Sequence, residues 1–163
     1  NCMKKVMLLG LLPLFINSGN VKTLEVSYEE AIIKLKPKSI QPVITDGDLL
    51  DALIFIESRG NDSAIGDRHL VGNEAVGALQ IRPIMVREVN RICKIIGSHE
   101  RFTLKDRFDR DKSIHMFMIW REFHHLDSSP EKIARNWNGG PNGYKKDRTI
   151  KYWNKIEKQL NNE

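Results

Sequence analysis

Apolar residues repeat with helical spacing in the segment 46–58. The residues at positions i, i+3, i+4 and i+7 of one face are Leu50, Leu53, Ile54 and Glu57. Thr45 and Asp48 match a capping box in which Asp replaces the usual Glu, so they predict the first turn. Gly60 favours the left-handed backbone conformation that ends many helices, so the helix is predicted to end there. The segment is therefore predicted to be a helix that carries a glutamate on its apolar face. The alternative is that Glu57 points outward beyond the last turn.

Helical patterns also occur in the second half of the chain. Residues 83–96 begin with a proline in the first turn and stop at Gly97. Residues 111–126 are apolar on nearly all sides, a pattern that is typical of a central buried helix. Shorter helices are predicted at 130–135 and 147–160. Together these patterns predict a mainly α fold.

The polar stretch 62–76 interrupts the helices and is predicted to form a loop or a small β-hairpin. With 163 residues, of which 40% are hydrophobic and 29% charged, the chain has the size and composition of one small globular core. We therefore assign residues 46–163 to a single domain. Cys93 lies on the apolar face of 83–96, so it is predicted to be a buried thiol, and no disulfide framework is implied.

The first 45 residues differ from the domain that follows. Lys4 and Lys5 precede an apolar run of eleven residues, 6–16, which is typical of a secretory signal peptide. We therefore assign 1–19 to a signal peptide and 20–45 to a linker or N-terminal arm. The alternative is that the apolar run stays attached as a packing or membrane-active segment. Eleven apolar residues are too few to span a bilayer as a helix, so no stable membrane span is expected after signal removal.

The net charge of +5 suits an anionic partner such as a cell wall or a nucleic acid. No basic stripe with interleaved aromatic residues stands out in the sequence, so nucleic acid is not expected as a partner. His124 and His125 are adjacent, and adjacent residues cannot face the same way on a helix, so they do not predict a metal site. No cofactor is expected.

Glu57 has the most specific chemistry in these patterns. A carboxyl group on a hydrophobic face is costly to ionise, so its pKa should rise. The negative end of the helix dipole also favours the protonated acid. A carboxyl group that holds its proton near neutral pH is suited to act as a general acid.

Four short motifs lie in order along the chain. They are Glu57-Ser58-Arg59-Gly60-Asn61, Gly77-Ala78-Leu79-Gln80-Ile81, Asn136-Trp137-Asn138-Gly139-Gly140 and Thr149-Ile150-Lys151-Tyr152. Over about residues 46–157 they resemble the lytic transglycosylase branch of the lysozyme-like superfamily, with its soluble (Slt-type) and goose-type relatives. The chain departs from the family pattern at Leu79, where a Met is usual, and at Trp137, where a Tyr is usual. The stretch 66–74 is also a departure, because it is polar and carries two extra acids.

The resemblance implies a lysozyme-like α(+β) fold and a reaction with one catalytic acid. Glu57 would protonate the glycosidic oxygen of peptidoglycan and then accept the proton of the C6 hydroxyl, which leaves a 1,6-anhydro end. Ser58 would lie near the lactyl or acetyl group of the substrate. Gln80 and the backbone around Ile81 would line the cleft, and Asn138 would hold the N-acetyl group.

Two aromatic residues complete the implied site. Trp137 would offer a stacking wall, and Tyr152 would orient the catalytic acid through its hydroxyl. For both, the simpler alternative is packing in the core. For Ser58 and Gln80, the simpler alternative is a hydrogen bond to nearby backbone.

Two other functions fit the same residues. A hydrolytic muramidase would use Asp67 or Glu74 as a second carboxylate that activates water. A non-catalytic wall-binding component of a phage particle or secretion apparatus would keep the cleft without the activity. All three functions make peptidoglycan glycan strands the partner. They place the protein in the periplasm or cell wall after export, or in a phage particle.

Overall fold

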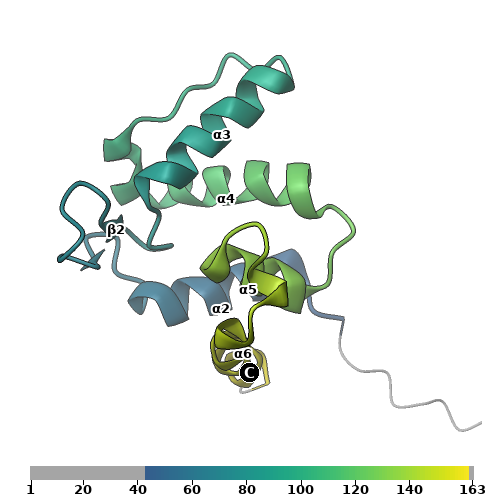
Figure 1. Cartoon of the computed structure of the whole chain (residues 1–163). Coiled ribbons are helices and arrows are strands. Elements are labelled where there is room, and N and C mark those ends of the chain that lie inside the picture. The colour runs from purple at the N-terminus through teal and green to yellow at the C-terminus, as the bar shows by residue number, and fades with distance from the viewer. Residues whose placement is uncertain (1–42, 162–163) are drawn as a thin grey trace, which may run out of the picture. The chain divides into compact units, whose positions relative to one another are not determined.

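The computed structural model describes residues 43–161, which form a set of helices and one small strand pair (Figure 1). The predicted mainly α fold is confirmed. The predicted signal peptide and nearly all of the predicted N-terminal arm lie outside the described residues. Between residues 43 and 161, no helix is long and apolar enough to cross a lipid bilayer.

The described α-helices and strands follow the order that the sequence patterns predict, and short 3₁₀ helices (η) are additional to them. In chain order, the elements are α2 (Asp46–Ser58), β1 (Ile65–Gly66), β2 (Ala75–Val76), α3 (Pro83–Ile95), η1 (Leu104–Phe108), α4 (Arg110–His125), α5 (Pro130–Gly139), η2 (Gly143–Lys145), η3 (Asp147–Thr149) and α6 (Ile150–Leu160). β1 and β2 pair antiparallel, with Ile65 opposite Val76. Of the two alternatives predicted for residues 62–76, the β-hairpin is therefore the one that forms.

The first turn of α2 is the one that the sequence predicts. The Thr45 hydroxyl accepts a hydrogen bond from the Asp48 amide at 3.2 Å, and the Asp48 carboxylate accepts one from the Thr45 amide at 2.8 Å. The left-handed conformation begins one residue earlier than predicted, at Arg59 (φ 56°). Leu53 and Ile54 of the predicted face are buried, whereas Leu50 is half-buried and Leu49 is buried instead.

Two groups of helices pack around the core (Figure 1). α3 packs on α4, while α2, α5 and α6 pack on one another. Arg121 on α4 joins the two groups through an ion pair with Asp46 on α2, at 2.9 Å between Nη2 and Oδ1. The largest fully buried side chains include Phe117, Leu49, Leu53, Leu79, Ile81, Ile92, Met116, Ile133 and Ile156. These side chains come from both groups, so the described domain has one core.

α4 is buried on one face only, which corrects the prediction of a helix that is buried on nearly all sides. Met116, Phe117 and Trp120 are buried. Phe123, in contrast, is 41% exposed, and Leu126 just beyond the helix is 63% exposed. α4 packs on α3 along one side and borders a cleft near its C-terminal end, so its remaining apolar residues meet solvent.

Two further predictions on the helices have different outcomes. α5 extends to Gly139, beyond the predicted end at residue 135, so the third motif lies on this helix up to Gly139. On α3, Cys93 is buried and free, as predicted. Ile96, the last residue of the predicted helix, is 57% exposed because the helix ends one residue before it.

A buried arginine fixes the turn between the hairpin and α3. Arg107 in η1 donates hydrogen bonds to the backbone carbonyls of Glu74 and Ile81, each at 3.0 Å. These carbonyls flank the turn that begins at Gly77, where φ is 77° and a Cβ would lie 1.8 Å from the carbonyl oxygen of Arg107. Only glycine fits there. The turn therefore holds Gln80 in one position.

Candidate functional site

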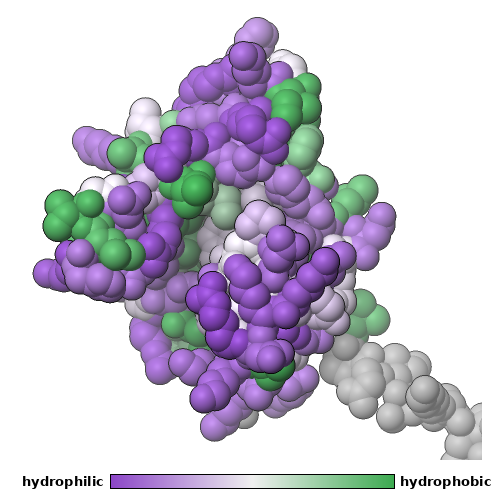
Figure 2. All heavy atoms as spheres, viewed as in Figure 1, coloured by the Kyte–Doolittle hydropathy of each residue, from purple (hydrophilic) through white to green (hydrophobic). Residues whose placement is uncertain are grey.

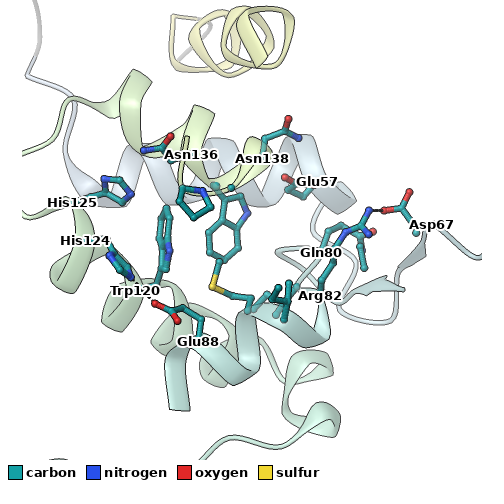
Figure 3. A pocket seen from close by; sticks show the side chains of 18 of the residues that line it. Glu57, Asp67, Gln80, Arg82, Glu88, Trp120, His124, His125, Asn136 and Asn138 are labelled. Carbon is teal, nitrogen blue, oxygen red and sulfur yellow. Dashed lines mark hydrogen bonds and ion pairs between the residues drawn. The ribbon is translucent and has the colours of Figure 1, made fainter. Parts of the chain in front are cut away.

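A cleft with a volume of about 900 Å³ lies between the two groups of helices (Figure 3). The surface is hollowed near the centre of the view in Figure 2, and mainly hydrophilic residues surround the hollow. α2, α3, α4, α5 and the hairpin all contribute side chains to the lining. We call the two ends of the cleft the acid arm and the histidine arm. The acid arm comprises Glu57, Asp67, Gln80, Arg82 and Asn138, and the histidine arm comprises Glu88, Trp120, His124 and His125 (Figure 3). Lys132 also lines the cleft and belongs to the histidine arm, because its charge acts on His125.

Glu57 extends from the last turn of α2 into the acid arm, so it does not point outward (Figure 3). Its Oε1 accepts a hydrogen bond from the Tyr152 hydroxyl at 2.7 Å. Burial raises the pKa of the Glu57 carboxyl to about 7; the hydrogen bond from Tyr152 opposes this shift, and the negative charge of Asp67 adds to it. Glu57 can therefore donate and accept a proton near neutral pH.

Gln80 lines the acid arm from the turn before α3. Its Nε2 donates a hydrogen bond to the carbonyl of Gly77 at 2.9 Å and another to the carbonyl of Ala64 at 3.4 Å. Gly66 in β1 permits this arrangement, because a Cβ there would lie 2.3 Å from Gln80 Oε1. Gln80 thus bonds to nearby backbone and lines the cleft as well.

The two acids that were candidates for a second carboxylate occupy different places. Asp67 lines the acid arm and forms an ion pair with Arg82 (Figure 3). The Glu74 carboxylate accepts a hydrogen bond from the Gly72 amide at 3.0 Å, and Glu74 is not part of the cleft lining. Of the two acids, only Asp67 is brought together with Glu57.

Trp137 belongs to the core and to the cleft. Its ring meets Phe117 and Trp120 in edge-to-face contacts, each with 5.1 Å between ring centroids. It also lines the cleft, as do Asn138 on the same helix and Ile81 in the preceding turn. The structure therefore gathers these predicted residues around one cleft with Glu57.

Two of the predicted site residues lie outside the cleft lining. The Ser58 hydroxyl donates a hydrogen bond to the carbonyl of Ile54 at 3.2 Å, which is the simpler alternative for this residue. Tyr152 contacts Glu57 without lining the cleft itself. Tyr152 is therefore placed to orient the acid, and Ser58 is placed to satisfy the end of α2.

In the histidine arm, the charge of Glu88 is balanced mainly by Arg91. Its carboxylate accepts two hydrogen bonds from the Arg91 guanidinium, both at 2.7 Å. His124 Nε2 lies 2.8 Å from Glu88 Oε1. The hydrogen bonds from Arg91, followed by that from His124, lower the pKa of Glu88 to about 2. Glu88 is therefore an anion at neutral pH.

His125 is buried against Trp120, with 4.7 Å between ring centroids, and its Nδ1 lies 3.2 Å from Ser128 Oγ. Burial lowers the pKa of His125 to about 4, and nearby positive charges add to this shift. Both His124 and His125 line the cleft, with 6.2 Å between ring centroids, which corrects the expectation that they serve different faces. The cleft at the end of α4 is wide enough to receive two diverging side chains.

Sequence patterns do not identify several residues that line the cleft. They are Arg82, Met85, Glu88, Trp120 and Lys132. Trp120 belongs to an apolar stretch that predicts only core packing. Lys132 lies one helical turn before Asn136 of the third motif, and this spacing is the pattern that could have pointed to it.

No protein-family model matches this chain. No curated protein matches it either. Its function is therefore inferred from the residues of the cleft and from the resemblance of its motifs.

Proposed function

We propose that this chain is a peptidoglycan lytic transglycosylase with a lysozyme-like fold, which cleaves the β-1,4 bond between N-acetylmuramic acid and N-acetylglucosamine. The observation that carries the proposal is the position of Glu57, a carboxyl group that lines an open cleft and accepts a hydrogen bond from Tyr152 at 2.7 Å; its pKa, raised to about 7 by burial, suits this position. A general acid is most effective when its pKa lies near the working pH. The order of the four motifs along the chain supports the same function.

Glu57 acts twice in the proposed reaction. In its protonated form it gives its proton to the glycosidic oxygen, and the bond between that oxygen and C1 of the muramic sugar breaks. The carboxylate then accepts the proton of the C6 hydroxyl while O6 forms a bond to C1. The products are a 4-hydroxyl on N-acetylglucosamine and a 1,6-anhydro ring, and no water is consumed. The intramolecular nucleophile has a high effective concentration, so no positioned water is needed.

The surroundings of Glu57 suit both steps. The hydrogen bond from Tyr152 stabilises the carboxylate that exists between the two proton transfers. The side-chain amides of Gln80 and Asn138 provide hydrogen-bonding groups in the acid arm. Trp137 provides an aromatic surface on which the apolar face of a sugar ring can lie.

A hydrolytic muramidase is the second candidate, and the position of Asp67 favours it. Asp67 lines the same arm as Glu57, and its charge acts on the Glu57 carboxyl. Asp67 forms an ion pair with Arg82, and a carboxylate at this place could activate water as the second carboxylate of a hydrolase. Glu74 is less suitable for this role because it does not line the cleft.

Export to the periplasm or cell wall, or packaging in a phage particle, belongs to the same proposal. A non-catalytic component of a phage particle or secretion apparatus would bind the wall without cleaving it. The raised pKa of Glu57 favours an active enzyme over such a component, because wall binding alone does not require a titrating carboxyl group.

The test is mass spectrometry of the fragments that the full chain releases from purified peptidoglycan, with Glu57→Gln as the inactive control. Fragments with anhydro-muramic ends, one water lighter than reducing ends, would support the transglycosylase. Reducing ends would identify a hydrolase and direct attention to Asp67. Binding to the wall without release of fragments would instead support the non-catalytic component.

A further inference from the structure

Most charged side chains in and around the histidine arm have a partner of opposite charge. Glu88 pairs with Arg91 at 2.7 Å and with His124 at 2.8 Å. Arg121, on the same helix as His124, pairs with Asp46 at 2.9 Å. Paired charges largely cancel each other's field, so these residues offer little net attraction to a charged ligand.

Lys132 is the exception. Among the lysines and arginines that line the cleft within residues 43–161, it is the one without an ion pair. Its neighbour Glu131 is engaged by Arg135 at 2.7 Å. Asp127, in the loop before α5, does not line the cleft. Lys132 therefore leaves this end of the cleft with an uncompensated positive charge.

The position of Lys132 gives its charge no stabilising role within its own helix. It lies in the first turn of α5, which the Ser129 side chain caps. The helix dipole is positive at that end, so a cation there is not stabilised by the helix. Burial lowers the pKa of His125, and the positive charges of His124 and Lys132 lower it further. The neutral His125 imidazole therefore lies in a positive local potential.

We propose that the histidine arm binds a carboxylate carried by the glycan strand, with Lys132 as its ion-pair partner and the imidazoles of His124 and His125 as hydrogen-bonding groups beside it. This inference rests on the proposed function, because it concerns the same substrate in the same cleft. A polymer of N-acetylglucosamine alone carries no carboxylate. Lys132 thus selects strands that contain muramic acid over neutral strands of similar length.

The carboxylate has two chemical sources in such a strand. One is the lactyl group of a muramic ring that carries no peptide. The other is a peptide attached to that lactyl group. Its attachment converts the lactyl carboxylate into an amide, and the peptide supplies carboxylates of its own. Both sources present the same group to Lys132, so the experiment uses a separate probe for each source.

Binding is measured by isothermal titration calorimetry on the full chain carrying Glu57→Gln, so that bound sugars are not cleaved. Three tetrasaccharides serve as probes. The first is neutral and contains N-acetylglucosamine only. The second alternates N-acetylglucosamine with N-acetylmuramic acid bearing free lactyl carboxylates. The third is the second with each lactyl group amidated by a dipeptide that carries one free carboxylate.

The decisive variant is Lys132→Met, which keeps a side chain of similar length and removes the charge. We expect it to weaken binding of a carboxylate-bearing tetrasaccharide about tenfold, the magnitude of one charge-assisted contact. Binding of the neutral tetrasaccharide should change less than about twofold. A selective loss with the second probe identifies the lactyl source, and a selective loss with the third identifies the peptide source.

Two variants control for effects other than lost charge in the cleft. Lys132→Arg retains the charge and should retain most of the affinity. Lys155→Met removes an exposed lysine on α6, outside the cleft lining, and should leave all three affinities unchanged. Equal losses for neutral and charged probes with Lys132→Met, or no loss for any probe that binds, would overturn the inference alone. A failure of all three probes to bind the parent chain would overturn the proposed function together with it.

Discussion

Glu57 and Glu88 line the same cleft, one in each arm, but their carboxyl groups titrate about five units apart. Burial raises the pKa of Glu57 to about 7, and no cation forms an ion pair with it among the described residues. Hydrogen bonds from Arg91 lower the pKa of Glu88 to about 2. The residue type is the same, so the difference comes from the partners that each helix brings to the carboxyl group.

This comparison indicates that the two arms have different roles. A buried carboxyl group without a cation can release and recover a proton near neutral pH, which is what the proposed chemistry requires. A carboxylate held by Arg91 and His124 cannot do so, because it stays ionised. The histidine arm is therefore suited to recognition, and the acid arm is suited to catalysis.

The largest expected effect comes from removing the titrating group of the acid arm. Glu57→Gln should lower kcat at least about 10³-fold, because the amide has a similar shape but cannot transfer the proton. Glu88→Gln should lower it less than about tenfold, because Glu88 only orders the histidine arm. Initial rates of fragment release from peptidoglycan measure both variants, and Glu157→Gln on the exposed face of α6 is the neutral control. Equal losses for Glu57→Gln and Glu88→Gln would remove the functional distinction between the arms.

The two glutamates should also affect stability in opposite pH ranges. The native pKa of Glu57 lies above its usual value of 4.5, so the folded protein binds the proton more tightly than the unfolded chain. The free energy of unfolding should therefore decrease as pH rises from about 4.5 to 7, by about 3 kcal/mol in total. Urea denaturation at pH 5 and pH 8 measures this decrease, which Glu57→Gln should largely abolish.

Glu88 provides the matched test at acid pH. Its native pKa lies below 4.5, so its contribution to stability is present above that pH and is lost as pH falls towards 2. Glu88→Gln should therefore reduce the loss of stability on acidification and leave the change between pH 5 and 8 intact. If Glu57→Gln left the change between pH 5 and 8 intact as well, the pKa of Glu57 would not be raised in the folded protein.

The acid arm could largely be predicted from the sequence. The spacing of apolar residues along 46–58 places Glu57 on a buried face, because helix periodicity is local and readable. The motifs that contain Gln80 and Asn138 carry a resemblance to one family, and the structure gathers both residues in the acid arm. The N-terminal cap of this helix could also be predicted, because Thr45 and Asp48 lie within one turn of each other.

The histidine arm could not be predicted in the same way. Glu88 and His124 are 36 positions apart, and periodicity shows which face of each helix is polar but not which faces meet. The same holds for one contact of the acid arm, the ion pair Asp67–Arg82, which joins the hairpin to the residue before α3 and which no local pattern specifies. Lys132 resembles any solvated lysine until the partners of its neighbours are known.

A smaller loss is expected from the residue that orients the acid. Tyr152→Phe removes the hydroxyl that donates to Glu57 Oε1 and should lower kcat about tenfold, through a less defined carboxyl position. The hydrogen bond from Tyr152 favours the ionised carboxylate. Without it the pKa of Glu57 should rise, and the alkaline limb of the rate profile should move to higher pH. Tyr144→Phe, at a tyrosine that is 42% exposed, is the control. A core-packing role alone would lower stability without moving the alkaline limb.

The smallest expected effect comes from Asp67, whose negative charge contributes to the raised pKa of Glu57. Asp67→Asn should lower that pKa, so the alkaline limb of kcat should move to lower pH by less than about one unit, since the ion pair with Arg82 already offsets part of the charge. Glu74→Gln, outside the cleft lining, should leave the limb in place. Asp67→Asn also separates the two proposed chemistries. Anhydro ends that persist in Asp67→Asn indicate that Glu57 works as the single acid, whereas loss of all product release in a variant that still folds would make Asp67 a second catalytic carboxylate.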